Sequence, residues 1–415
     1  MRPSLRTFTL LTALSATPAI ATADVVLDWN AIALTTMRNQ NPFAQARYAA
    51  IVQLAVFEAV NTVAGEYEPY LGTLPAQPHA SADAAAVAAA HRVLTTYFPA
   101  SATMLDSLRA ASLATIAEGT AKDEGLAIGV AVADALIAQR ALDGSGNLAL
   151  YFPTSAAPGE WQLTPSCTLG GGLFFHWRNV TPFALPAAEA FRAPVPPGID
   201  STPYANDYAE VMRVGASESI ERPGDRADVA RLYAVTTGAS LWNSAARQVA
   251  AAQGRSLSHN AWALALLNIA LSDSLVASME SKYHFRLWRP ETAIQEADLD
   301  GNPKTEANPA FVPFISTPCF PSYPSAHASA AYAALEVLTR IYEGGGHRIV
   351  LTNPLVAGVT LEYTRFRTIA EDIDDARVYG GIHFRFDQEG GARQGKAVAA
   401  YVLQHTLRPL APNEF

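Results

Sequence analysis

The chain has 415 residues, of which 50% are hydrophobic and 16% are charged, and this composition excludes an intrinsically disordered protein. Its net charge of -9 argues against a nucleic-acid binder, whose binding surface is basic. Two cysteines are too few for a disulfide-rich scaffold or a multi-cysteine metal site. These figures predict a large, acidic, globular protein and leave its function open.

Residues 1–23 resemble a secretory signal peptide. Arg2 and Arg6 precede the apolar, Thr-rich stretch 8–20, and Ala21-Thr22-Ala23 offers small residues for cleavage. A short apolar N-terminal helix is the alternative interpretation. Removing this segment deletes two arginines and no acidic residue, so the charge moves from -9 to -11. The predicted location is therefore periplasmic or secreted.

In such a compartment Cys167 and Cys319 can form one disulfide, although two free buried thiols fit the sequence as well. No segment is a convincing membrane span. The best candidate, residues 261–279, contains Asn268 and Asp273 and is better interpreted as a buried core helix.

Helical periodicity dominates the first half of the chain. Apolar residues recur at i, i+3 and i+4, whereas the alternating pattern of strands is scarce. Ser81 and Ser101 are candidate N-caps. The sequence therefore predicts an all-α protein built as a large helical bundle. The predicted helices of this half span residues 49–63, 81–97, 102–116 and 123–142.

The second half contains two stretches rich in Pro, Gly and aromatic residues, 143–225 and 298–323, which are predicted to be irregular. Helices are expected at 226–279, 325–342, 360–369 and 388–406. No repeat or long polar linker divides the chain. We therefore expect an N-terminal helical region at 24–225 and a catalytic helical region at 226–415, joined as one continuous domain.

Cations, imidazoles and a hydroxyl concentrate in three segments of the second half. The segments run from Lys282 to Pro290, from Pro324 to His327, and from Arg377 to Asp387. Lys282 and Arg289 are two helical turns apart, so both are predicted to point from one helix face, with Pro290 ending that helix.

Ser325 begins a predicted helix, where free backbone N–H groups favour an anion, although a simple N-cap role fits as well. Arg377 adds a planar guanidinium that can grip two oxygens. Together these groups suit a tetrahedral or trigonal-bipyramidal oxyanion. His327 and His383 can flank it, one bonding the central atom and the other moving protons. Asp387, four residues after His383, can fix the histidine tautomer.

The three segments, K-x6-R-P, P-S-x-H and A-R-x5-H-x3-D, resemble the signature of the vanadium-dependent haloperoxidase and type 2 phosphatidic acid phosphatase superfamily. Residues 28–30 and 47–69 are also similar to the secreted bacterial haloperoxidase branch. The resemblance is strong across residues 273–387. It implies an all-α fold with the active site inside the C-terminal bundle.

The resemblance also implies a role for each matching residue. Lys282, Arg289 and Arg377 bind the equatorial oxygens of vanadate, and Lys282 also polarises bound peroxide. Ser325 and the Ala326 backbone N–H add hydrogen bonds. His383 is the axial ligand, and His327 is the acid/base group.

Four further residues are candidate pocket residues. Asp273 lies where the family often has a supporting Asp, and His284 neighbours the first segment. Phe320 resembles chloride-oxidising members, whereas Met279 stands where those members often have Trp. Ala326 also departs from the commoner Gly and can crowd the oxyanion.

The leading interpretation is a secreted vanadate-dependent haloperoxidase that oxidises halide with hydrogen peroxide to hypohalous acid or another halogenating species. Its partners are small molecules, namely peroxide, halide and an organic acceptor. The alternative is a soluble acid phosphatase of the same superfamily, with phosphate in the same site, His383 as nucleophile and His327 as acid. A third interpretation is a catalytically weak oxyanion-binding protein. The halide, the acceptor and the oligomeric state remain open.

Overall fold

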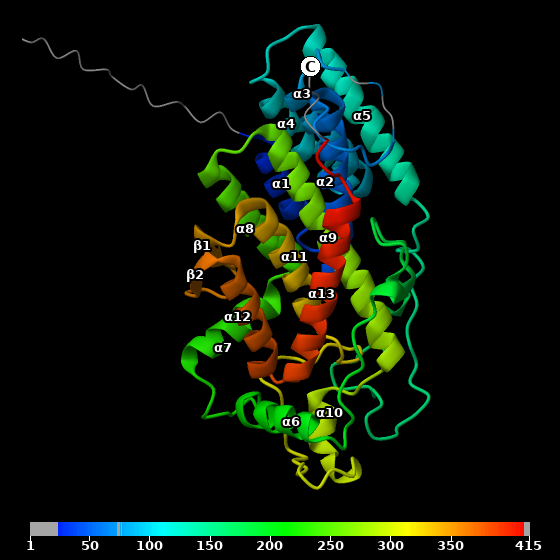
Figure 1. Ribbon diagram of the computed structural model, residues 1–415, viewed down its shortest axis with the longest axis vertical. Coiled ribbons are helices and arrows are strands. Elements are labelled where there is room, and N and C mark those ends of the chain that lie inside the picture. The colour runs from blue at the N-terminus through cyan, green and yellow to red at the C-terminus, as the bar shows by residue number, and fades with distance from the viewer. Residues whose placement is uncertain (1–23, 73–74, 76, 411–415) are drawn as a thin grey trace, which may run out of the picture.

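The computed structural model describes residues 24–72, 75 and 77–410. The predicted signal peptide therefore lies outside the described residues. The chain is mainly helical, as predicted (Figure 1). Its helices are α1 Val25–Thr36, α2 Pro42–Ala64, α3 Ala82–Tyr97, α4 Ala102–Leu113, α5 Thr120–Arg140, α6 Thr202–Val214, α7 Gly224–Val235, α8 Gly238–Gln253, α9 Leu257–Phe285, α10 Pro290–Gln295, α11 Ala326–Tyr342, α12 Phe366–Tyr379 and α13 Arg385–His405.

The helix α9 is the central element of the bundle. Most of its residues are buried, and α2, α11 and α13 pack against it. Among the described residues, α9 is the one helix that is long and apolar enough to cross a membrane. However, 89% of its most apolar window is buried inside the protein, which agrees with the prediction of a core helix.

Figure 1 shows α1 to α5 gathered at one end of the molecule and α6 and α10 at the other. The apolar core nevertheless runs through both halves, from Val25 on α1 to Leu407 beyond α13. Ser81 caps α3 as predicted, because its side chain accepts a hydrogen bond from the Ala84 N–H. Ser101 occupies the N-cap position of α4 as predicted, but its side chain makes no capping bond.

The helices α11 and α13 approach each other closely because α13 carries small residues along the contact. A Cβ added at Gly395 would overlap the Ser329 carbonyl oxygen of α11. Gly391 also faces α11, where an added Cβ would meet the Ala328 side chain at 2.8 Å. This packing brings the first turns of both helices together.

The helix predicted at 360–369 is wrong in its first half. Residues Thr360–Arg365 form strand β2, which pairs antiparallel with β1 (Gly345–Thr352), and α12 starts only at Phe366. The strands fit these residues because Ile349, Leu351 and Tyr363 turn one buried face toward the helices.

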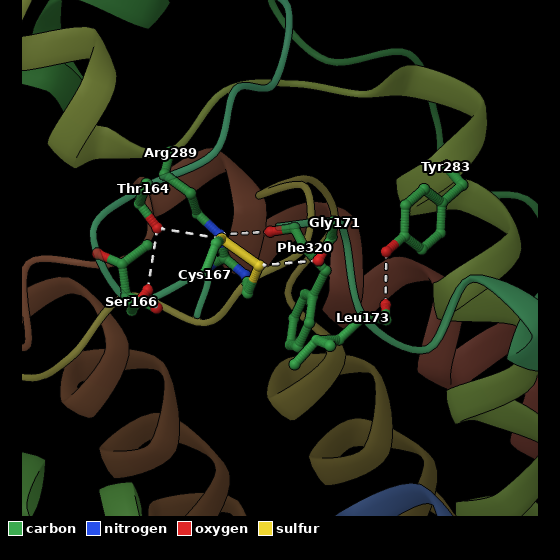
Figure 2. The surroundings of a disulfide bond; sticks show 10 residues. Thr164, Ser166, Cys167, Gly171, Leu173, Tyr283, Arg289 and Phe320 are labelled. Carbon is green, nitrogen blue, oxygen red and sulfur yellow. Dashed lines mark hydrogen bonds between the residues drawn. A yellow bond between two sulfur atoms is a disulfide. The ribbon is translucent and has the colours of Figure 1, made fainter. Parts of the chain in front are cut away.

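The irregular segment is shorter than predicted. It ends at α6, which Ser201 caps through the Tyr204 N–H. The remaining stretch contains the short 3₁₀ turns Phe175–Asn179 and Ala188–Phe191; others lie at Pro99–Ser101 and Ala297–Leu299. A disulfide between Cys167 and Cys319 ties this segment to the second irregular stretch and settles the open question of their pairing (Figure 2).

Candidate oxyanion site

Lys282 and Arg289 meet, but not as the sequence predicted. The helix α9 ends at Phe285, and Arg286 turns the chain with a left-handed φ of 51°. Arg289 is therefore the N-cap of α10, and Pro290 begins that helix instead of ending α9. The prediction of a shared helix face is wrong because α9 ends before it reaches Arg289. Pro290 can begin α10 because a proline is tolerated at the first position of a helix.

Backbone carbonyls of residues 320–322 bring the two cations together. Lys282 Nζ donates to the Pro321 and Ser322 carbonyl oxygens at 3.0 and 2.6 Å. Arg289 Nε donates to the Phe320 carbonyl oxygen at 2.8 Å (Figure 2). Both side chains are fully buried. Among the described residues, no carboxylate forms an ion pair with either of these two buried cations.

Two buried donor atoms beside His383 have no protein partner among the described residues. Arg289 uses one terminal nitrogen on the Ile382 carbonyl oxygen and the His383 ring, and its other terminal nitrogen is unpartnered. Arg377 donates to the Tyr233 carbonyl oxygen at 3.3 Å, while its Nε is unpartnered. Buried donors of this kind normally have an acceptor. Both therefore fit a bound anion.

His383 is oriented from both sides of its ring. Its Nδ1 lies 2.7 Å from the Asp387 carboxylate, and its Nε2 lies 3.0 Å from an Arg289 nitrogen. A guanidinium can only donate, so Nε2 accepts and Nδ1 carries the proton that binds Asp387. This assignment directs the Nε2 lone pair toward the cations. Asp387 Oδ2 also accepts from the Ser322 hydroxyl at 2.5 Å.

Burial and the neighbouring charges shift the pKa values of the groups in this cluster. Burial, with the neighbouring Arg289, Lys282 and Arg377, lowers the pKa of His383 well below its usual value, and burial with the same cations lowers the pKa of His327 likewise. Burial lowers the pKa of Arg289 to about 9 and raises that of Asp387 to about 6. Both histidines are consequently neutral near pH 7, and the cluster favours an added anion.

The second segment adds a helix N-terminus. Ser325 is the N-cap of α11: its hydroxyl accepts from the Ala328 N–H, and its own N–H donates to the Asp387 carbonyl oxygen at 2.9 Å. The Ala326 and His327 N–H groups lie in the first turn, where no carbonyl within the helix can satisfy them. They remain available to an anion.

A cavity of about 540 Å³ adjoins this cluster, and His327, Arg377, Ala326 and Phe320 all line it. The Phe320 ring centroid lies 5.3 Å from Lys282 Nζ and 5.0 Å from the Arg289 guanidinium carbon. Its position on the cavity wall matches the prediction that Phe320 is a pocket residue.

The other three candidate pocket residues do not line this cavity. Asp273 is fully buried, and its carboxylate accepts from the backbone N–H groups of residues 183–185 at 2.7–3.1 Å. It therefore anchors the irregular segment. Met279 lies on a core-facing side of α9, and His284 is exposed with its ring against Phe285. Nearness to Lys282 in the sequence was a poor guide to the cavity lining, because successive residues of α9 point in different directions.

The sequence did not predict three contributors to the site. Ser322 orients Asp387 through its hydroxyl, and the carbonyls of residues 320–322 and of Tyr233 hold the cations. Backbone carbonyls have no signal in a sequence. Ser322 has a weak sequence signal, since it lies just before the second segment, three residues ahead of Ser325.

No group of three or more His, Cys, Asp or Glu side chains is placed to hold a metal ion in the described part of the chain. The cluster instead offers many hydrogen-bond donors and one unprotonated imidazole nitrogen, Nε2 of His383. This donor set suits an oxyanion whose central atom is bonded by His383.

Comparison with known proteins agrees with this chemistry. Residues 262–412 match the family model described as the VCPO second helical-bundle domain, and this range contains all three segments. A 90-residue stretch is 31% identical to the vanadium chloroperoxidase of Curvularia inaequalis and covers 19% of this chain and 14% of that protein. Residues 262–412 therefore belong to the vanadium haloperoxidase superfamily.

Solved haloperoxidase structures share the fold along most of the chain. A bacterial vanadium-dependent iodoperoxidase aligns with a TM-score of 0.80 at 24% identity, covering 96% of this chain and 100% of that one. A bacterial vanadium-dependent chloroperoxidase aligns with a TM-score of 0.68 at 18% identity, covering 89% and 94%. At these identities the likeness establishes the haloperoxidase fold.

Proposed function

We propose that this protein is a vanadate-dependent haloperoxidase that oxidises halide with hydrogen peroxide. The observation that carries the proposal is the pair of buried, unpartnered guanidinium nitrogens on Arg289 and Arg377 near the unprotonated Nε2 of His383. Vanadate is an oxyanion whose oxygens accept such hydrogen bonds and whose metal accepts an imidazole nitrogen.

Lys282, Arg289, Arg377 and the first N–H groups of α11 would hold vanadate by its oxygens, and His383 Nε2 would bind the metal. Bound vanadate supplies a Lewis acid that activates peroxide while staying at one oxidation state. Asp387 keeps the proton on His383 Nδ1, so that Nε2 stays free to bind. The buried cations would stabilise negative charge on the bound oxygens.

His327 is proposed as the group that moves protons. It lines the cavity, and burial together with the nearby Arg377, Lys282 and Arg289 lowers its pKa, so it is neutral near pH 7 and can accept a proton. A neutral imidazole can take the proton of an incoming peroxide and return it to a leaving oxygen.

The same geometry favours an acid phosphatase as a second candidate. His383 Nε2 is an unprotonated nitrogen oriented by Asp387 and can act as a nucleophile, and phosphate satisfies the same donors. In that reaction His327 would protonate the leaving alcohol.

One paired assay tests both candidates. The purified protein, loaded with orthovanadate, is assayed for peroxide-dependent bromination of a phenol, and the vanadate-free protein is assayed for hydrolysis of a phosphate ester. We expect bromination. Hydrolysis without bromination would contradict the haloperoxidase proposal, and vanadate binding with neither activity would favour a passive oxyanion binder.

We also propose an oxidising location, periplasmic or extracellular. The Cys167–Cys319 disulfide supports it, because such bonds persist mainly outside the reducing cytosol. Export of the protein with residues 1–23 removed, detected by mass spectrometry of the secreted or periplasmic fraction, tests this location; an intact N-terminus in the cytosol would contradict it.

A further inference from the structure

The cavity beside the oxyanion site is far larger than the proposed reaction of peroxide and halide requires. Its volume is about 540 Å³. A water-sized molecule occupies about 30 Å³, whereas sites for organic molecules typically measure about 300–1,000 Å³. Peroxide and a halide ion would therefore leave most of the space empty. The volume matches an organic molecule of moderate size.

The wall of the cavity is mainly apolar and includes aromatic rings. Phe43, Phe174 and Phe320 contact one another, with ring centroids 4.6 Å apart for Phe43 and Phe174 and 6.2 Å apart for Phe174 and Phe320. Trp242 and Tyr233 add two more aromatic side chains to the lining. Such a surface favours a flat, apolar ring system over a sugar or an ion.

Arg377 and His327 are the cationic and imidazole side chains of the lining, and both belong to the oxyanion cluster. An occupant of the cavity therefore meets polar groups where the cavity adjoins that cluster and apolar groups elsewhere. A hydroxyl on an otherwise apolar ring complements this arrangement, because it can accept from Arg377 and exchange a hydrogen bond with His327.

Part of the wall is held in place before any molecule binds. Leu173 and Cys319 both line the cavity, and the Leu173 N–H donates to the Cys319 carbonyl oxygen at 2.8 Å. The disulfide from Cys319 to Cys167 ties the same two segments together (Figure 2). The next residue, Phe320, bonds Arg289. A pre-formed wall lowers the ordering cost of binding an organic molecule.

We propose that this cavity binds an apolar phenol and holds it for halogenation beside the site where the halogenating species forms. The proposal rests on the haloperoxidase function above. Hypohalous acid, the product of that reaction, transfers its halogen to a ring carbon: the O–X bond breaks, a C–X bond forms, and the ring proton leaves with the hydroxide as water. The acceptor is thus a bound substrate, and its orientation selects one ring position.

Gly238, the first residue of α8, provides a direct test. It lines the cavity, and a Cβ added there meets only the Ala330 Cβ, at 3.7 Å. Gly238→Leu should therefore fill part of the cavity without a backbone clash. Gly224 is the matched control, since it begins α7, is exposed and has open space around an added Cβ.

The experiment titrates 4-phenylphenol into the vanadate-loaded full chain without peroxide and measures Kd by calorimetry. We expect wild type to bind this probe at least about tenfold more tightly than hydroquinone, which lacks the second ring, as its additional buried apolar area requires. Gly238→Leu should weaken binding about tenfold or more, whereas Gly224→Leu should leave Kd unchanged. Equal Kd values for wild type and Gly238→Leu, or no preference for the apolar phenol, would overturn the assignment.

Two further readouts separate this proposal from the proposed function. Oxidation of iodide to triiodide without an organic acceptor reports the haloperoxidase activity alone. If wild type oxidises iodide but does not bind 4-phenylphenol, the cavity assignment is wrong and the function stands. If it binds the phenol but oxidises no halide, the halogenation step is overturned. With both present, we expect one major ring isomer when wild type halogenates 2-phenylphenol, in which an ortho and the para position are free. An isomer ratio equal to that of free hypohalous acid would contradict bound halogenation. A failure of Gly238→Leu to fold leaves these wild-type measurements decisive.

Discussion

At the scale of single residues, the orientation of His383 depends mainly on Asp387. The carboxylate binds His383 Nδ1 and the Ser322 hydroxyl, and it is completely buried. It also offsets part of the charge of three buried cations. A change at this residue should therefore affect the imidazole without removing any group that touches the anion.

Asp387→Asn should weaken orthovanadate binding about 10- to 100-fold, as is usual when a group that orients a metal-binding histidine is altered. The amide no longer selects the Nδ1–H tautomer, because it can donate as well as accept. Calorimetric Kd values for wild type and variant measure the effect. Asp374→Asn, the same change outside the site, should keep the wild-type affinity, and an unaltered Kd in Asp387→Asn would contradict the role assigned to Asp387.

Asp374 itself predicts a pH effect on stability. Burial raises its pKa to about 7 from 3.8, despite the hydrogen bond from the Tyr332 hydroxyl at 2.9 Å. Between these values the folded protein keeps a proton that the unfolded chain releases, so the free energy of unfolding falls as pH rises through this window.

Asp374→Asn should remove this fall in the free energy of unfolding with rising pH, because the amide carries no charge at any pH. We expect the variant to be more stable than wild type at pH 8, by about 1–2 kcal/mol, and the difference to shrink at pH 5. Urea unfolding at the two pH values measures it. A stability difference that stayed constant or grew on acidification would refute the assignment.

At the scale of elements, the packing of α11 against α13 sets the distance between Ser325–His327 and His383. Gly395→Ala would place a methyl group on the Ser329 carbonyl oxygen. We expect a loss of about 1–3 kcal/mol in unfolding free energy, as for other overpacked contacts. Gly224→Ala, at the open start of α7, should cost almost nothing in the same urea titration. Equal stability of the two variants would argue against a close contact.

The disulfide is the second element-scale feature, because it joins the two irregular segments next to the cations. The double variant Cys167→Ala/Cys319→Ala should lose about 2–4 kcal/mol of unfolding free energy. It should also bind orthovanadate more weakly, since residues 320–322 follow directly and hold Lys282 and Arg289. Wild type treated with a thiol reductant should resemble the variant. Unchanged stability in both would show that the bond is dispensable.

The elements show where sequence reasoning succeeds. Helices with a repeated apolar face, such as α3 and α11, were predicted almost to the residue, because periodicity records burial directly. The strand β2 was not, since its six residues are too few to distinguish the two periods. The reversal at Arg286 was also missed, because a left-handed residue other than glycine is uncommon and nothing nearby signals it.

The site was predictable to a similar extent. Residue types and spacing indicated which side chains gather around His383, namely Lys282, Arg289 and Arg377. That they bind an oxyanion stays a prediction. The supports of these side chains were not predictable. Asp273 turned out to anchor residues 183–185, and backbone carbonyls hold Lys282, because such contacts depend on segments that meet only in the folded chain.

At the scale of the whole molecule, the net charge of -9 conceals the relevant charges. The acidic residues lie mostly on the surface, whereas Lys282, Arg289 and Arg377 are buried around His383. Residues of two apolar clusters pack around them, and this burial strengthens their attraction for an anion. The division at residue 225 into two regions of one domain stays a prediction.

The most direct test of the account is the rate of peroxide-dependent bromide oxidation as orthovanadate is added to the dialysed protein. We expect no rate without vanadate, a saturable rise to a plateau, competition by phosphate, and no rise with His383→Ala. A rate that does not respond to vanadate, or an equal response in His383→Ala, would contradict the central claim that this cation cluster and His383 form a catalytic vanadate site.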